Sequence, residues 1–154
     1  MVNKLKQYGM FCILIIFVSL LTKCNLKSGF KESQAFYITN KDKMTTICMQ
    51  YINMSNVSSI SINEIKDNKG KSIDINTFDN KDKSDIEQIR EFIKEKNILR
   101  ISTKNENRVI LFYLGNMDGI AFTNSIPSEF FIEKGFGQFI KIDEKFYYFI
   151  DKTI

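Results

Sequence analysis

Hydrophobic and polar positions alternate over many short stretches of the chain, and this pattern predicts a domain rich in β-strands. Most stretches contain β-branched and aromatic side chains and are bounded by Asn, Lys, Asp or Ser, as strands usually are. The expected strands occupy residues 35–39, 45–52, 58–66, 72–78, 98–103, 108–114, 120–124, 138–142 and 145–150.

Within the third stretch, Ile60 and Ile62 stand two residues apart, so alternation places both on one face of a single strand. Residues 67–71, "DNKGK", contain turn-forming residues and predict a turn before the next strand. Residues 116–119, "NMDG", predict a second turn.

One amphipathic helix is expected from Asp85 to Lys96. Ser84 and Glu87 have the spacing of a capping box, in which each side chain satisfies a free amide of the first turn. Asn97 is suited to close the helix. The apolar face of this helix consists of Ile86, Ile89 and Ile93.

The order of elements is several strands, one helix and several more strands. This order favours an α+β fold with a mainly antiparallel sheet and the one amphipathic helix packed across one face. We expect a single domain over residues 35–154, preceded by a polar tether over residues 24–34 and a signal peptide over residues 1–23.

The last two strands are expected to form a hairpin across Asp143 and Glu144, with aromatic residues on both faces. One face has Ile140 and Ile142 and is the better core candidate. The other includes a lysine, which resists full burial, and large apolar patches at a surface tend to bind partners. The predicted partner-binding residues are Phe139, Lys141, Phe146 and Tyr148.

The N-terminal segment has the layout of an export signal. Lys4 and Lys6 precede an apolar run over residues 10–21, and no acidic residue occurs before Glu32. The 16 residues between Lys6 and Lys23 would extend roughly 24 Å as a helix, at 1.5 Å per residue. This is short for a hydrocarbon core of about 30 Å, so an uncleaved membrane span is the alternative to a cleaved signal.

The apolar run ends in "LLTKC", residues 20–24, and here the sequence resembles a bacterial lipoprotein signal. Leu21 matches the usual leucine of that class, while Lys23 replaces its usual small residue. The resemblance implies that Cys24 is acylated and becomes the mature N-terminus, and it covers residues 1–24 only. If Cys24 is unmodified, it could instead form a disulfide with Cys48, although Cys48 is better explained as a buried thiol.

The amino-acid composition limits the classes of function and the kinds of site that the chain could have. Without the three lysines of the leader, 19 basic and 18 acidic residues remain, whereas nucleic-acid binders usually have a basic excess. The chain has no histidine, which removes histidine-dependent nucleophiles and histidine-ligated metal sites. The acidic stretches at residues 67–74 and 79–85 do not match a calcium loop.

These observations predict a non-catalytic binding or assembly module, tethered to the membrane at the bacterial cell envelope, with its domain outside the cytoplasm. We expect no metal, no cofactor and no nucleic acid, and a protein partner of unknown identity. Two alternatives stay open: an inhibitor or immunity-type protein that neutralises a toxin or enzyme, and a protein anchored by an uncleaved single span.

Overall fold

The computed structural model describes residues 29–104, 109–123 and 136–151. The chain divides into two compact units, residues 1–32 and residues 33–154. The predicted signal peptide and Cys24 lie outside the described residues.

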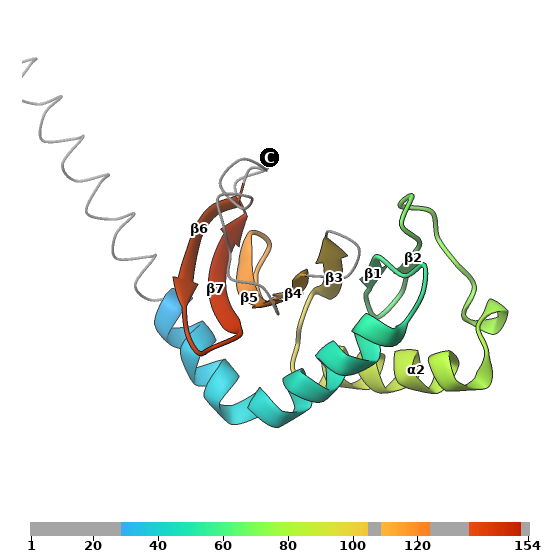
Figure 1. The fold of residues 1–154 in the computed structure, drawn as a ribbon, viewed down its shortest axis with the longest axis horizontal. Helices are drawn as coiled ribbons and strands as arrows, with labels where there is room; N and C mark the ends of the chain where they lie inside the picture. The colour runs from blue at the N-terminus through green and yellow to red at the C-terminus, as the bar shows by residue number, and fades with distance from the viewer. Residues whose placement is uncertain (1–28, 105–108, 124–135, 152–154) are drawn as a thin grey trace, which may run out of the picture. The chain divides into compact units, whose positions relative to one another are not determined.

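The described residues form a seven-stranded sheet in which every pair of neighbours is antiparallel. The order of the strands is β2-β1-β3-β4-β5-β7-β6 (Figure 1). The protein therefore has the mixed helix and antiparallel-sheet architecture that the sequence predicts. The strands are β1 Ser59–Ile60, β2 Ile65–Lys66, β3 Arg100–Lys104, β4 Val109–Tyr113, β5 Asp118–Thr123, β6 Phe136–Lys141 and β7 Phe146–Asp151.

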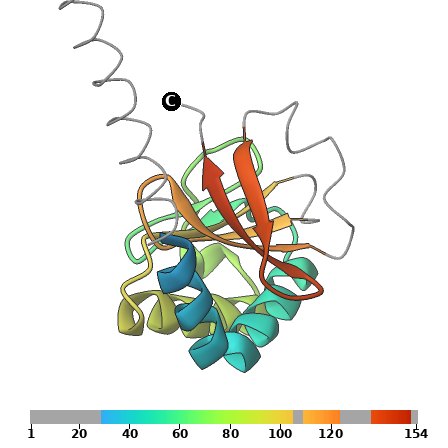
Figure 2. The ribbon, with the colours of Figure 1, turned by 90° about the vertical axis from the view of Figure 1, so that its left-hand side faces the viewer.

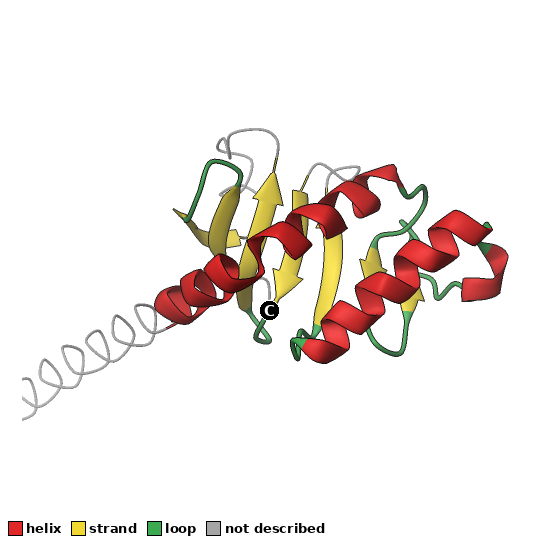
Figure 3. Ribbon diagram, turned by 90° about the horizontal axis from the view of Figure 1, so that it is seen from below, coloured by secondary structure: helices red, strands yellow, loops and turns green. Residues whose placement is uncertain are grey.

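Two helices, rather than the single one expected, lie on one face of this sheet. The first occupies residues 29–53 and the second, α2, is Asn80–Glu95. Figure 2 shows them together beneath the sheet, and Figure 3 shows them crossing the same face. The prediction of one helix is therefore wrong.

The first helix replaces the strands that were predicted at residues 35–39 and 45–52. Its buried apolar residues recur at helical intervals, so they form one stripe that faces the sheet. The β-branched and aromatic composition of the segment suggested strands, but packing of this stripe outweighs intrinsic preference. The tether was expected over residues 24–34, and residues 29–34 are helical instead. The stripe consists of Tyr37, Met44, Ile47, Cys48 and Tyr51.

Helix α2 begins more than a turn earlier than the predicted capping box. Asp79 is the N-cap, and its carboxylate accepts a hydrogen bond of 2.8 Å from the backbone N–H of Asp82. Ser84 lies inside the helix, so its predicted capping role is wrong. Acidic caps satisfy free amides as well as serine does, and the earlier one sets the start. The helix buries Ile86, Ile89, Phe92 and Ile93.

Asn97 ends the helix as predicted, with a left-handed φ of 54°. The next residue, Ile98, donates its backbone N–H to the carbonyl of Ile93 at 2.9 Å. This pattern is a Schellman motif, which satisfies the last carbonyls of a helix.

The segment from residue 58 to residue 66 is a tight hairpin, β1 and β2, and not one strand. Ile60 is fully buried, whereas Ile62 lies in the connecting turn with 49% of its surface exposed. The predicted pairing of these two isoleucines on one face is wrong because the chain reverses between them. The turn at residues 67–71 is confirmed, with the Gly70 N–H 2.9 Å from the Asp67 carbonyl. Residues 72–78, predicted as a strand, contain instead the short 3-10 helix η1, Ile75–Thr77.

The sheet is buried on both faces at its centre. A large cluster fills the space between the helices and one face, and includes Ile110, Phe112 and Phe122. The alternating positions Val109, Leu111 and Tyr113 belong to a second cluster on the other face. All five residues of β4 are therefore buried, which explains why the strand is a continuous apolar run.

Candidate functional site

The predicted partner-binding residues are not gathered on one surface, because the β6–β7 register differs by one residue from the prediction. Lys141 pairs with Tyr147, and Phe139 with Phe149. The connection is wider than the expected two-residue turn, since the backbone N–H of Ile142 and that of Asp143 both reach the Phe146 carbonyl. A shift of one residue turns a strand's side chains to the opposite face, so the predicted shared face is wrong.

Phe146 and Tyr148 belong to the interior. Their exposed fractions are 4% and 2%, and the Phe146 ring contacts Tyr37 of the first helix at a centroid distance of 4.7 Å. Phe139 is half-buried on the other face, stacked on Phe149 at 6.2 Å. Of the four residues only Lys141 is exposed. A partner contact by Phe139 and Lys141 stays a prediction.

Cys48 is fully buried on the first helix, rather than in a strand. Burial raises the pKa of its thiol well above the usual value. Since the thiolate is the reactive form, Cys48 is a packing residue rather than a nucleophile.

A concave, polar region lies beside the β1–β2 hairpin and defines the candidate site, here named the polar cavity. Its volume is about 650 Å³, and side chains from the hairpin, from β3 and from the ends of β4 and β7 line it. Strand register places several of these residues on the sheet face opposite the helices. The lining includes Ser59, Glu64, Lys66, Arg100, Ser102, Tyr113 and Asp151.

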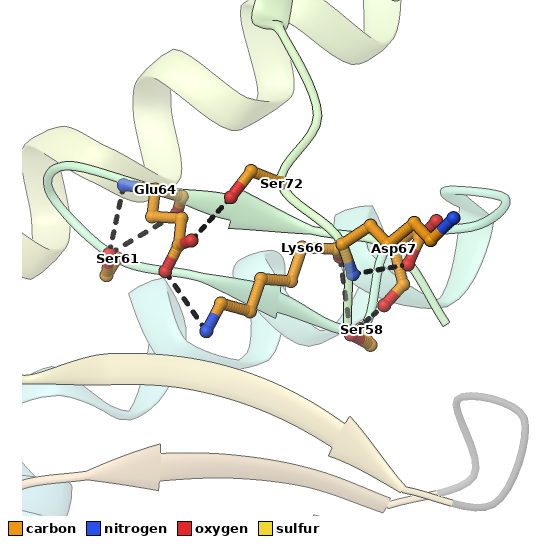
Figure 4. Close-up of polar contacts among 7 residues, drawn as sticks. Ser58, Ser61, Glu64, Lys66, Asp67 and Ser72 are labelled. Atoms are coloured by element: carbon orange, nitrogen blue, oxygen red, sulfur yellow. Dashed lines mark hydrogen bonds and ion pairs between the residues drawn. The ribbon is translucent and has the colours of Figure 1, made fainter. Parts of the chain in front are cut away.

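The hairpin wall is held by side-chain hydrogen bonds (Figure 4). The Ser61 hydroxyl accepts from the Glu64 backbone N–H at 3.1 Å, and the Ser58 hydroxyl donates to the Asp67 carbonyl at 2.5 Å. These bonds offset the short length of β1 and β2, because two-residue strands have few ladder bonds of their own.

Glu64 is the charged centre of that wall, and its negative charge is paired with the positive charge of Lys66. One carboxylate oxygen accepts from the Ser72 hydroxyl at 2.5 Å, and the other lies 3.2 Å from the Lys66 ammonium (Figure 4). The hydrogen bond from Ser72, followed by that from Lys66, lowers the pKa of Glu64. Glu64 and Lys66 therefore form a local ion pair.

The opposite wall holds a stacked arginine. The Arg100 guanidinium lies 4.1 Å from the centroid of the Tyr113 ring, a geometry typical of cation–π contacts. The Tyr113 hydroxyl donates to Asp151 at 3.0 Å. Burial is the main cause of the raised pKa of Tyr113, so the phenol stays a neutral donor and fixes the ring on which Arg100 rests.

The polar cavity offers hydrogen-bond donors and charge, and its residues suit binding. The hydroxyls of Ser58 and Ser61 are bonded to backbone groups, whereas nucleophilic catalysis requires a hydroxyl paired with a basic side chain. Among the described residues, no group of three or more Cys, Asp and Glu side chains could hold a metal ion.

A second polar cluster joins the first helix to the β6–β7 loop. The Tyr37 hydroxyl and the Lys41 ammonium each lie 2.6 Å from the same oxygen of Asp143. The contact with Lys41, then that with Tyr37, lowers the pKa of Asp143 far below its usual value. Desolvation first, and the hydrogen bond to Asp143 second, raises the pKa of Tyr37 to about 12. Both pKa shifts favour the state in which Asp143 is ionised and Tyr37 is protonated. The three side chains therefore connect the first helix to the β6–β7 loop.

The polar cavity was not predicted from the sequence, although one pattern in the sequence indicates it. In β3 the polar Arg100 and Ser102 alternate with Ile101, which is fully buried. This pattern indicates a strand with one open polar face. Arg100 and Ser102 lie near Ser59 and Lys66 only because residues 58–66 form a hairpin, whereas the alternating pattern predicted a single strand there.

Within the part of the chain that the structure describes, no helix combines the length and apolar character needed to cross a bilayer. Comparison with protein-family models, with curated proteins and with solved structures gave no match.

Proposed function

We propose that this chain is a binding module tethered to the bacterial cell envelope, and that it holds a protein partner through the polar cavity without catalysing a reaction. The tether part of the proposal rests on the sequence of residues 1–24, where a lipoprotein-like signal ends in Cys24. The binding part rests on the geometry of residues 58–66, 99–103 and 113–116 and of Asp151.

The observation that carries the proposal is a concave polar surface with prearranged walls. Hydrogen bonds within the hairpin hold one wall, and the contacts of Tyr113 hold the other. Binding sites gain affinity when their groups are ordered before the ligand arrives, because less conformational entropy is lost on binding. Ordered donors around a cavity of about 650 Å³ could surround several side chains of a partner segment.

The rest of the described surface supports this choice of site. Its large exposed apolar side chains are single residues: Ile38 at 70% and Met49 at 53% lie on the first helix, and Ile62 and Met117 lie in the β1–β2 and β4–β5 connections. Scattered apolar side chains are normal on a protein surface. The polar cavity is instead formed by four separate segments that converge on one concave region.

A site-specific photo-crosslinker tests the proposal. We would replace Ser102 with p-benzoylphenylalanine in the full-length protein, expressed in the cells that naturally produce it. The matched control carries the same residue in place of Glu91, which is exposed on α2. The expected result is one defined protein adduct from position 102 that is absent from position 91.

The adduct should also disappear when Ser59 is changed to Trp, because a bulky ring would fill the polar cavity next to Ser102. Equal adducts from the two crosslinker positions, or none from position 102, would contradict the proposal.

A further inference from the structure

We infer that the polar cavity recognises side-chain carboxamide groups, those of asparagine and glutamine, on a segment of the partner protein, and that this recognition depends little on ionic strength. The inference rests on the proposed binding function and adds the chemistry of the ligand.

The charges that line the polar cavity are balanced. Its carboxylates are those of Glu64 and Asp151, and its cations are those of Lys66 and Arg100. Glu64 and Lys66 lie 3.2 Å apart. Arg100 stacks on the Tyr113 ring, and the hydroxyl of that ring donates to Asp151. A ligand of either sign therefore meets attraction and repulsion together, and its net charge gains little.

The same charged side chains supply both kinds of hydrogen-bonding group. Lys66 and Arg100 can only donate, whereas the ionised carboxylates of Glu64 and Asp151 can only accept. Arg100 is exposed, and stacking on an aromatic ring orients a planar guanidinium without using its edge N–H groups. A ligand that fits this lining needs a donor and an acceptor close together, rather than a charge of one sign.

The uncharged part of the lining has the same dual character. Ser59, Ser102 and Asn116 line the polar cavity, and among the described residues their side chains have no hydrogen-bond partner. Ser59 and Ser102 are paired across β1 and β3, so both point to the same side of the sheet. Hydroxyl and carboxamide groups both donate and accept. A ligand that displaces water here must therefore offer both functions.

A carboxamide meets these requirements better than the alternatives. It carries a carbonyl acceptor and an NH2 donor at the tip of a neutral side chain, and a side chain can enter a concave site. A carboxylate would meet the charges of Glu64 and Asp151, and an ammonium would meet that of Arg100. An apolar side chain would leave donors and acceptors without partners, which costs free energy when water is excluded.

Nuclear magnetic resonance titration of the full-length, nitrogen-15-labelled protein in a mild detergent tests the inference. The probe is a terminally capped peptide of alternating glutamine and glycine, and the reference peptides have glutamate, lysine or alanine in place of glutamine. We expect the glutamine peptide to shift the backbone amide signals of Ser59 and Ser102. It should bind about threefold or more tightly than each reference peptide, as one additional hydrogen bond provides.

Ionic strength and a matched pair of variants sharpen the test. Binding of the glutamine peptide should change by less than about twofold between about 50 and about 300 mM salt, because screening acts on charged ligands. Ser102→Ala should weaken that binding by about threefold. Ser84→Ala removes the same hydroxyl from an exposed position on α2 and should leave the binding unchanged. The same spectra show that both variants are folded.

Tighter binding of the glutamate or lysine peptide would overturn the inference, because the polar cavity would then recognise charge. Equal binding of the alanine peptide would overturn it in favour of backbone recognition, and equal loss in the two serine variants, or no shift at Ser59 and Ser102 with any peptide, would also refute it. A crosslinked partner at position 102 combined with any of these results would refute the carboxamide ligand and leave the proposed function standing. Absence of that partner would refute the proposed function itself.

Discussion

The two isoleucines of the β1–β2 hairpin provide a direct test of the fold. Simple alternation places Ile60 and Ile62 on the same buried face, whereas the structure buries Ile60 completely and leaves Ile62 with 49% of its surface exposed. The same substitution, isoleucine to alanine, should therefore have very different effects two residues apart.

The magnitude follows from the surroundings of each side chain. Ile60 belongs to the main core cluster, which lies between the helices and the sheet. Ile60→Ala therefore removes buried methyl groups and leaves a cavity. Such changes cost about 2–5 kcal/mol of unfolding free energy. Ile62 lies in a turn, and Ile62→Ala should fall within about 0.5 kcal/mol of the parent, as surface substitutions usually do.

Urea unfolding of the full-length protein in mild detergent measures both values. The chain has no tryptophan, so circular dichroism at the helix band is a better signal than fluorescence. The midpoint should shift only for Ile60→Ala, with an unchanged slope against urea concentration. Similar losses for both variants would show that residues 58–66 form one strand and would refute the hairpin.

Three further predictions address the helix cap, the loop contact and the N-terminus. Asp79→Ala should cost about 1 kcal/mol in the same urea assay, through loss of the N-cap of α2, and Ser84→Ala should cost clearly less; the reverse order would place the cap at Ser84. The folded-state pKa of Asp143 lies below its unfolded value, so its stabilising contribution is complete above about pH 4 and disappears as the pH falls through the lower, folded pKa. Asp143→Asn should therefore reduce the thermal midpoint at neutral pH and make little difference in strong acid, whereas the exposed control Asp42→Asn should have little effect at either pH; a loss that persists in acid would argue against the ionic contact. Cys24→Ser should abolish partitioning into the detergent phase and change the intact mass by more than the substitution itself, and identical partitioning of the two proteins would favour an uncleaved anchor.

Local sequence determined the elements whose signals act within a few residues. The turn at residues 67–71 needs a residue that tolerates positive φ, and Gly70 supplies it with a φ of 77°. Asn97 ends α2 for the same reason, since asparagine adopts the left-handed region more readily than most residues. The antiparallel sheet of the C-terminal half followed from short apolar stretches that are separated by turn residues.

Tertiary packing decided what those local signals left open. Residues 35–52 have the composition of strands, but their buried residues share one side only in a helix, and the core selects that arrangement. The β6–β7 loop contains Asp143, whose contacts with Tyr37 and Lys41 come from a helix about a hundred residues away in the sequence. No local pattern contains that information.

The polar cavity is the clearest product of tertiary structure. Its walls come from the β1–β2 hairpin, from β3 and from the ends of β4 and β7, and each contributes ordinary surface residues when read alone. Only the sheet order, which places β1 beside β3, brings Ser59 next to Ser102 on the face that Arg100 shares. Local sequence thus determined the turn at residues 67–71 and the end of α2, and long-range strand pairing determined which side chains meet, because pairing partners are selected by the packing of the whole core rather than by neighbours in the chain.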